Sequence, residues 1–317
     1  MFDNQIYIKR KSGTRFAYLL VAAVGLQLLC VTAGRANSDS VNNQLVYLPF
    51  IRDGASVDQV YAPYNEDGNR LFAQDFDGTS SGQVNETALE RLFNDPLWDN
   101  GVEEGRIFIV AGDVAYEGQS LEVRYPRGTV GPKQGGGQWP VELGAGYNEL
   151  YVAYRVRFPE GFDFVKGGKL PGLVGGEANS GGDRPNGRDG WSARMMWTRE
   201  GKVIQYVYHP DQPKSSGDDM DWDLSGQRYF QPGVWHTVEH RVVMNTPGSS
   251  NGLIEGWFDG DLAFRREGLR FRDVDQLAID ALYFSTFFGG SGADWAAQQD
   301  ESIFFDDFVI STEPITH

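Results

Sequence analysis

The stretch from residue 150 to residue 158, LYVAYRVRF, decides the fold class. Its even-numbered positions are all apolar or aromatic, whereas the positions between them carry tyrosine, alanine and two arginines. A period of two is typical of a strand with one face packed on a core and the other in water. Similar alternation occurs in residues 120–125, 235–244 and 303–310. In residues 257–264 the dipeptide Asp259-Gly260 suits a tight turn and predicts a hairpin.

The composition agrees with a single β-rich domain. The chain has 317 residues, of which 40 are glycine, and only residues 88–93 indicate a short helix. Many short strands joined by Gly-rich turns are typical of a two-sheet antiparallel sandwich. We therefore predict an all-β, concanavalin-like jelly-roll sandwich with a concave substrate groove, formed by residues 71–317.

The N-terminus has the pattern of a targeting segment. Basic residues precede an uncharged run from Phe16 to Ala33, and small residues follow. We predict a signal peptide over residues 1–36, a polar arm or linker over residues 37–70, and a secreted or periplasmic protein. A retained membrane anchor is the alternative, because the run is at the lower limit of spanning length. A glycine and a glutamine inside the run favour cleavage, after which we expect no stable membrane insertion.

Thiol and metal chemistry are not expected. Cys30 is the only cysteine and lies inside the predicted signal peptide, so a cleaved chain has no disulfide and no thiolate. The sequence has 4 histidines, too few and too scattered for a Cys/His metal centre. We predict that no cofactor is required, although the carboxylates of Asp306-Asp307 could bind a structural Ca²⁺.

The charge balance limits the partners. The formal net charge is −16, and cleavage after residue 36 would remove five basic residues and one acidic residue, leaving −20. Such a surface repels nucleic acids and anionic membranes. An anionic substrate would therefore need a local basic groove, and we expect a monomer that binds no nucleic acid.

Cations and phenols gather between residues 166 and 208. Lys169 lies in the Gly/Pro-rich run KGGKLPGL, which favours a loop, and Ser192-Ala193-Arg194 and Tyr206-Val207-Tyr208 follow. Because residues i and i+2 of a strand point to the same face, each of these two pairs would present its polar groups to one groove. Ala193 and Val207 would then pack inward.

These side chains suit β-elimination from a uronate. The C5 hydrogen lies next to the carboxylate, and removing it places a second negative charge on an anionic group. Arg194 and Lys169 could neutralise that charge as it develops. A phenol with an ordinary pKa of about 10, lowered by these cations, could take the C5 proton or protonate the departing O4.

Three further residues are weaker candidates for substrate binding. Ser192 and Gln138 could hold a substrate group, and His240 could bind substrate or act as a second base. Each cluster member also has an ordinary structural alternative. Lys169 could be a solvated surface lysine, Arg194 could form an ion pair, and Tyr-x-Tyr is common in strands. Residues 248–252 match the G-x-S-x-G motif but join two predicted strands, so they lack the required strand-turn-helix context.

The ordered motifs resemble the alginate and glucuronan lyases of polysaccharide lyase family 14. The resemblance covers about residues 105–312. It implies a jelly-roll fold, and it implies that Lys169, the Ser192/Arg194 pair and the Tyr206/Tyr208 pair match the family's functional residues. The motifs that carry it are Lys166–Leu173, Trp191–Arg194, Tyr206–Tyr208, Tyr125–Gly128, Gly136–Trp139 and Phe305–Phe308.

Three functions compete on this sequence. The first is a secreted polyuronate lyase that acts on mannuronate-rich alginate or on glucuronan, with Lys169 and Arg194 as the cations. Tyr206 and Tyr208 would supply the base and the acid, in an order that the sequence leaves open, or one of them would serve both steps while the other binds. The second is a glycoside hydrolase on the same sandwich, which would need two carboxylates in the groove. The third is a lectin-like module that binds carbohydrate without catalysis. All three imply a polysaccharide partner.

Overall fold

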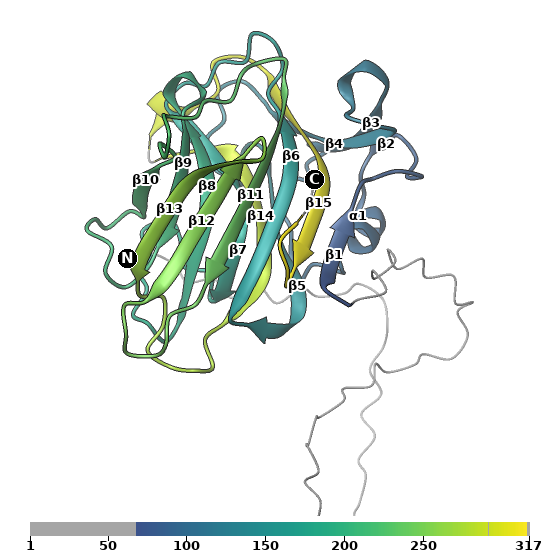
Figure 1. Cartoon of the computed structure of the whole chain (residues 1–317). Coiled ribbons are helices and arrows are strands. Elements are labelled where there is room, and N and C mark those ends of the chain that lie inside the picture. Colours follow the sequence, from purple (N-terminus) through teal and green to yellow (C-terminus); the bar gives the residue numbers. More distant parts are fainter. Residues whose placement is uncertain (1–67, 291, 316–317) are drawn as a thin grey trace, which may run out of the picture. The chain divides into compact units, whose positions relative to one another are not determined.

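The computed structural model describes residues 68–290 and 292–315 (Figure 1). The predicted signal peptide and nearly all of the predicted arm lie outside the described residues. Within the described part, no helix is long and apolar enough to cross a bilayer.

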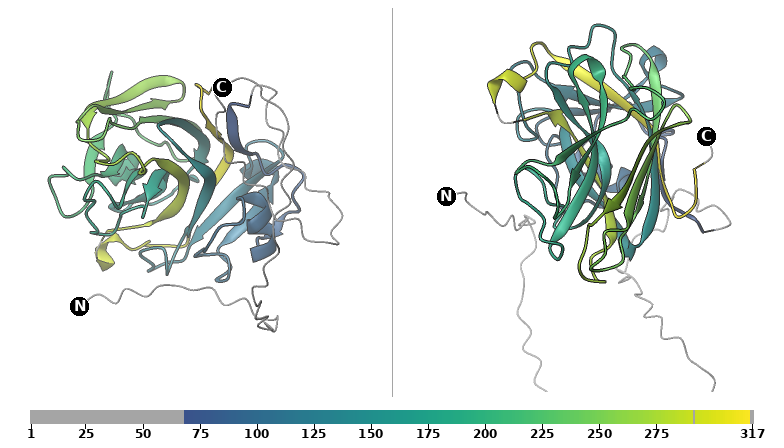
Figure 2. Two further views of the ribbon diagram at one scale, coloured as in Figure 1. Left: turned by 90° about the horizontal axis from the view of Figure 1, so that it is seen from below. Right: turned by 60° about the vertical axis from the view of Figure 1, so that its left-hand side comes forward.

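The fold consists of two antiparallel sheets that lie face to face (Figure 2). The nine-stranded sheet has the order β13-β12-β11-β6-β15-β4-β3-β2, with β1 also paired to β15, and the six-stranded sheet has the order β10-β9-β8-β7-β14-β5. The prediction of an all-β, two-sheet antiparallel jelly roll is confirmed.

The nine-stranded sheet contains β1 (Arg70–Gln74), β2 (Gly82–Gln83), β3 (Ile107–Ala111), β4 (Gln119–Tyr125), β6 (Glu149–Arg157), β11 (Trp235–Val243), β12 (Gly252–Phe258), β13 (Asp261–Leu269) and β15 (Glu301–Ser311). The six-stranded sheet contains β5 (Gly137–Tyr147), β7 (Gly167–Gly176), β8 (Gly190–Thr198), β9 (Val203–Tyr208), β10 (Asp218–Asp221) and β14 (Ile279–Phe288). One α-helix, α1 (Glu86–Leu92), overlaps the predicted helix, and short 3₁₀ turns occur at Gly112–Val114, Arg199–Gly201 and Ala293–Trp295.

The predicted strands and hairpin occur where the alternation placed them. The opening stretch forms β6, and its even-numbered side chains are buried between the sheets. The hairpin β12–β13 turns at Asp259 and Gly260, whose φ angles of 50° and 85° are both left-handed, as a two-residue hairpin turn requires.

Aromatic side chains fill the space between the two sheets. Trp139 of β5 and Phe284 of β14 stack in parallel with their ring centroids 4.1 Å apart, and Phe93 packs against both rings. From the other sheet, Tyr154 stacks on Phe308 with the centroids 5.1 Å apart. Each of these rings buries a large apolar area, so together they contribute much of the folding free energy.

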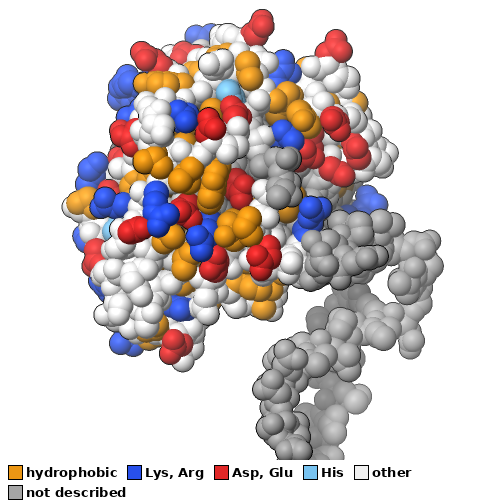
Figure 3. Space-filling view, viewed as in Figure 1, with side chains coloured by type: hydrophobic (Ala, Val, Ile, Leu, Met, Phe, Trp, Pro, Cys, Tyr) orange, Lys and Arg blue, Asp and Glu red, His pale blue; other side chains and the backbone are white. Residues whose placement is uncertain are grey.

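The solvent-facing side of the nine-stranded sheet carries an ion-pair network. Figure 3 shows acidic and basic side chains interspersed on this side. Arg241 pairs with Glu255 at 2.8 Å and with Glu149 at 2.7 Å, and Arg265 also pairs with Glu255. Because Arg241 and Arg265 both have acidic partners, their charges are largely neutralised for an approaching polyanion.

His240 is a correction to the sequence analysis, which included it among the substrate-binding candidates. It lies on β11 in register with Val152 and Gly256, and its side chain is buried between the sheets together with Val238 and Val242. Its Nδ1 atom is 3.4 Å from Nε2 of Gln205, whose side chain enters the same interior from the opposite sheet. His240 is therefore a core residue.

We expect Phe284→Ala to destabilise the protein by about 3–5 kcal/mol, since it leaves a cavity beside Trp139. Chemical denaturation measures the change. Leu224→Ala is the matched control because Leu224 is exposed, and it should change the free energy of unfolding by less than about 0.5 kcal/mol. Equal effects of the two substitutions would contradict the packing described for Phe284.

The burial of His240 predicts a pH-dependent stability. Burial lowers the pKa of His240 to about 3, whereas an unfolded histidine has a pKa of about 6.5. Between these pH values the unfolded state binds a proton at residue 240 that the folded state does not bind. His240 therefore leaves the free energy of unfolding unchanged above pH 6.5 and lowers it progressively as the pH falls toward 3. The slope of this change is at most about 1.4 kcal/mol per pH unit.

His240→Gln should remove that slope. Denaturation of both proteins at several pH values gives the free energy of unfolding of each as a function of pH. We expect the two curves to converge as the pH falls. Curves that stay parallel would show that the pKa of His240 is the same in the folded and unfolded states, which contradicts its burial.

Candidate active site

Strand register brings the predicted site residues other than His240 onto one surface, the face of the six-stranded sheet that points away from the nine-stranded sheet, here called the outer face. Arg194 of β8 lies opposite Tyr206 of β9, and Ser192 lies opposite Tyr208. The residues between them, Ala193 and Val207, belong to the core. The two predicted same-face pairs therefore lie side by side.

Lys169 lies in a strand, which corrects the predicted loop. It is the third residue of β7 and pairs with Met196 of β8 and Phe287 of β14. Glycine and proline are accommodated in this central strand because the register shifts between Leu170 and Gly172, which places Pro171 in a bulge where its missing N–H breaks no regular pair.

The Lys169 amine is enclosed by apolar and aromatic groups. Its Nζ is 2.9 Å from the sulfur of Met196 and 4.0 Å from the centroid of the Tyr206 ring, and the residue is 7% exposed. Burial, assisted by the nearby Arg194 cation, holds the pKa of Lys169 well below its ordinary value, while Asp219 acts in the opposite direction. This environment therefore disfavours the charged form of the amine.

Arg194 is buried beside it. The residue is 2% exposed, its Nη1 donates to the hydroxyl of Ser285 at 3.1 Å, and its guanidinium carbon is 5.5 Å from the Tyr283 ring centroid. Its buried Nε has no hydrogen-bond partner among the described residues. Burial lowers the pKa of Arg194, yet a guanidinium stays charged at any ordinary pH.

The two tyrosines contact each other and two loop amides. Their ring centroids are 5.6 Å apart at 84°. The Tyr206 hydroxyl accepts a hydrogen bond from the Gly217 amide at 3.1 Å, and the Tyr208 hydroxyl accepts one from the Gly182 amide at 3.0 Å. Residues 177–189 and 209–217, which contain these amides, enclose the phenols, leaving Tyr206 7% and Tyr208 2% exposed.

The pKa of Tyr206 departs from expectation. The sequence analysis expected cations to lower it, but burial and a hydrogen bond with Tyr208 raise it, and the Gly217 amide and Arg194 oppose this only in part. Desolvation outweighs charge here because the phenol is covered by the adjoining loop. Tyr206 therefore keeps its proton at neutral pH.

Ser192 and Gln138 already have partners on or near the outer face. The Ser192 hydroxyl donates to the backbone carbonyl of Asn179 at 2.8 Å, so it anchors residues 177–189. Gln138, on the edge strand β5, donates to the Tyr283 hydroxyl. Both residues border the cluster, and Ser192 has the structural role that a strand-edge hydroxyl commonly has.

Three neighbours of the cluster were missed in the sequence. Met196, Tyr283 and Ser285 contact Lys169 or Arg194. Met196 could have been found by extending the same-face pattern Ser192/Arg194 by two residues. Tyr283 and Ser285 come from β14, and no local pattern shows which distant strand pairs with β7.

The proposed Ca²⁺ site receives no support. Asp306 is buried and hydrogen-bonded to the Ser120 hydroxyl, and burial raises the pKa of Asp306 to about 7. Asp307 forms an ion pair with Arg155 at 2.7 Å. Among the described residues there is no group of three or more His, Cys, Asp or Glu placed to hold a metal ion.

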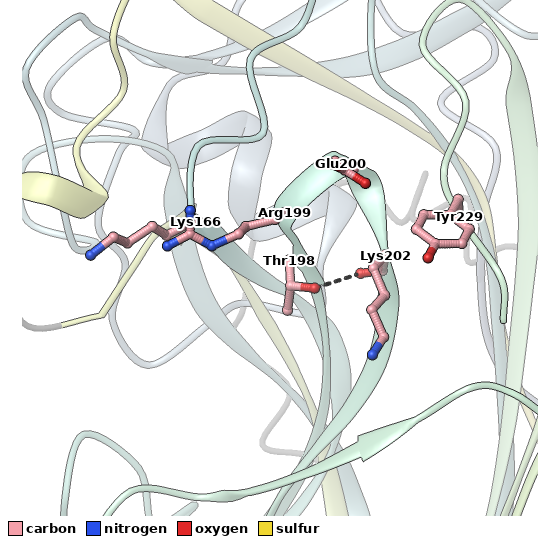
Figure 4. A pocket seen from close by; sticks show the side chains of 6 residues that line it. All are labelled: Lys166, Thr198, Arg199, Glu200, Lys202 and Tyr229. Carbon is pink, nitrogen blue, oxygen red and sulfur yellow. Dashed lines mark hydrogen bonds between the residues drawn. The ribbon is translucent and has the colours of Figure 1, made fainter.

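A separate cavity of about 440 Å³ lies where β8 ends and β9 begins (Figure 4). It begins two residues along β8 from Met196, and its lysines have acidic partners: Lys202 pairs with Asp221 at 2.7 Å and Lys166 pairs with Asp294. The lining residues are Lys166, Thr198, Arg199, Glu200, Lys202 and Tyr229. The cavity contains none of the four candidate catalytic residues.

Comparison with solved structures shows a shared fold. The alginate lyase Aly36B is 24% identical over 78% of this chain and 98% of its own, with a TM-score of 0.65. The PL-14 alginate lyase of Aplysia kurodai is 24% identical over 77% and 99%, with a TM-score of 0.65. The endo-β-1,4-glucuronan lyase of Trichoderma reesei is 16% identical over 77% and 96%, with a TM-score of 0.50.

The sequence comparisons identify the family. No protein of curated function matches the chain. The family described as polysaccharide lyase 14 matches residues 114–308. This range includes Lys169, Arg194, Tyr206 and Tyr208, here called the outer-face cluster. The chain therefore belongs to polysaccharide lyase family 14 and is a polysaccharide lyase.

Proposed function

We propose that this enzyme cleaves a polyuronate, mannuronate-rich alginate or glucuronan, by β-elimination at the outer-face cluster. One observation carries the proposal: two buried basic residues, Lys169 and Arg194, lie beside two phenols, Tyr206 and Tyr208, on a single face. Supporting it, Aly36B variants with a lysine and a tyrosine, or a lysine and a methionine, replaced have been solved with alginate oligosaccharides.

The cations would bind the uronate carboxylate. The positive charges of Lys169 and Arg194 repel each other, and water screens this repulsion poorly because both side chains are buried. A carboxylate between them relieves this repulsion, raises the pKa of Lys169 and can accept from the unpaired Arg194 Nε. Since the charge on that carboxylate grows as C5 loses its proton, the same donors stabilise the transition state more than the bound substrate.

The phenols would divide the proton transfers. Tyr206 keeps its proton because its pKa is raised, so it suits the acid that protonates the departing O4. The Tyr208 oxygen accepts a hydrogen bond from the Gly182 amide and is also hydrogen-bonded with the Tyr206 hydroxyl. Tyr208 therefore suits the base that takes the C5 proton, because these neighbours can stabilise its phenolate. C5–H then breaks, the electron pair forms the C4–C5 double bond, and O4 leaves with a proton.

The one-sided arrangement also favours a substrate. Both phenols lie on the same face and touch each other. In mannuronate and glucuronate H5 and O4 are on the same side of the ring, whereas in guluronate they are on opposite sides. The geometry therefore favours mannuronate-rich alginate or glucuronan. We further propose that the enzyme is secreted, where such polymers occur, and works without a cofactor.

Lys169→Ala and Tyr208→Phe should each lower kcat by about 10²- to 10³-fold, since each removes a group used in the transition state. Turnover of polymannuronate, polyguluronate and glucuronan is followed by the ultraviolet absorbance of the unsaturated product. Lys202→Ala is the matched lysine control and should keep wild-type turnover, because Lys202 lies in the separate cavity.

Three outcomes would contradict this function. New reducing ends without absorbance would indicate hydrolysis. Binding of the polymers with neither signal would indicate a carbohydrate-binding module. Wild-type turnover in both Lys169→Ala and Tyr208→Phe would remove these residues from the mechanism.

Gly217→Ala tests the positioning of the phenols. A Cβ at residue 217 would lie 2.8 Å from the Tyr208 ring and 2.9 Å from the Tyr206 ring, while the φ angle of Gly217 is outside the left-handed region. We expect a fall in kcat of about tenfold or more and an altered pH profile. Ser216→Ala, at the exposed neighbouring residue, is the control. Wild-type kcat and pH profile in Gly217→Ala would show that the phenol positions do not limit turnover.

A further inference from the structure

The outer-face cluster continues across the sheet toward its β5 edge. Gly172 of β7 lies opposite both Arg194 of β8 and Tyr283 of β14, and Tyr283 lies opposite Pro140 of β5. Tyr283 contacts Arg194 on one side and Gln138 of β5 on the other. A line of outer-face positions therefore runs at right angles to the strands, from the cations to the edge of the sheet.

A segment preceding β3 extends this edge. Asn100 and Gln138 exchange two backbone hydrogen bonds, of 2.8 Å and 2.9 Å, in an antiparallel bridge. Directly opposed residues point to the same side of a sheet, so Asn100 shares the outer face with Gln138. Gly101 permits this approach: its φ is 113°, and a Cβ there would lie 2.7 Å from the Gly136 carbonyl oxygen.

Trp98 lies at this edge with part of its ring in solvent. It is 37% exposed, and its ring meets that of Tyr283 edge to face with the centroids 6.0 Å apart. The next residue back, Leu97, is 68% exposed. A tryptophan that leaves this much surface in water adds little to the core, whereas its indole face suits a ligand with an apolar side.

We infer that Trp98 is a sugar-stacking subsite for the polyuronate chain, an inference that rests on the proposed function. A chain lying along the line from Arg194 past Tyr283 soon reaches Trp98, since the Tyr283 ring centroid is 5.5 Å from the Arg194 guanidinium carbon and 6.0 Å from the Trp98 ring centroid. The C–H face of a pyranose ring packs on the indole there. Residues 97–101 lie outside the stretch that the family model matches, residues 114–308.

The character of this contact differs from that of the cations. Stacking needs no charge on the protein, and two acidic residues, Asp99 next to Trp98 and Glu142 on β5, lie near this end of the line. Salt screens the attraction between carboxylates and cations but leaves an apolar contact unchanged. The contribution of Trp98 to substrate affinity should therefore persist at high ionic strength. It should strengthen the binding only of chains long enough to reach from Arg194 to the sheet edge.

Steady-state kinetics of Trp98→Ala test the inference. We expect KM for the polymer to rise roughly five- to tenfold, with kcat unchanged and the same ratio at low and high salt. For the shortest oligosaccharides that the wild type cleaves, KM should match that of the wild type. Leu97→Ala should leave KM unchanged, and Trp98→Phe should restore most of the affinity.

The outcomes separate this inference from the proposed function. A wild type that produces no unsaturated product from any polyuronate overturns both. An active wild type with the same polymer KM in Trp98→Ala overturns the subsite alone. An equal rise in KM for short and long chains also overturns it, because the substitution would then act on the cluster rather than on a distal sugar.

Discussion

The structure depends on the two-residue alternation of the central strands β7, β8 and β9. Most inward side chains of these strands are apolar or aromatic and join the core between the sheets, with Gln205 as a polar exception. The outward positions are therefore free to carry groups that a core would reject. Ala193 and Arg194 illustrate the constraint, because moving the strand by one residue would exchange them and place a cation among the aromatic rings. The stability of the sandwich thereby fixes the orientation of the reactive groups.

That orientation places two cations where water reaches them poorly. Desolvation is the largest influence on the pKa values of both Lys169 and Arg194. Their neighbours make up for the lost hydration only in part. Lys169 lies against the sulfur of Met196 and the ring of Tyr206, and Arg194 donates one hydrogen bond to the Ser285 hydroxyl while its Nε has no hydrogen-bond partner among the described residues. A buried charge without full compensation is costly to the free protein. The same deficit makes a carboxylate the ligand that stabilises the site most.

The sequence predicted what is local and missed what is not. The pairs Ser192/Arg194 and Tyr206/Tyr208 lie on one face because alternation is a property of a single strand. Lys169 was expected in a loop, since its Gly/Pro-rich surroundings conceal a central strand whose bulge accommodates proline. His240 was misplaced because alternation shows that a residue shares a face with its i+2 neighbours but not which face is the core. Tyr283 depends on pairing between distant strands, which no local pattern specifies.

The acidic surface and the buried cations together determine how a polyanion can be held. A chain with a net charge of −16 repels a polyuronate at long range, so affinity must come from contacts at short range. Two cations can serve only the sugar that reacts, and further cations along the line would compete with them for the charged chain. Aromatic contacts at the sheet edge avoid that competition, since they hold a neighbouring sugar by its apolar face and leave the carboxylate to Lys169 and Arg194.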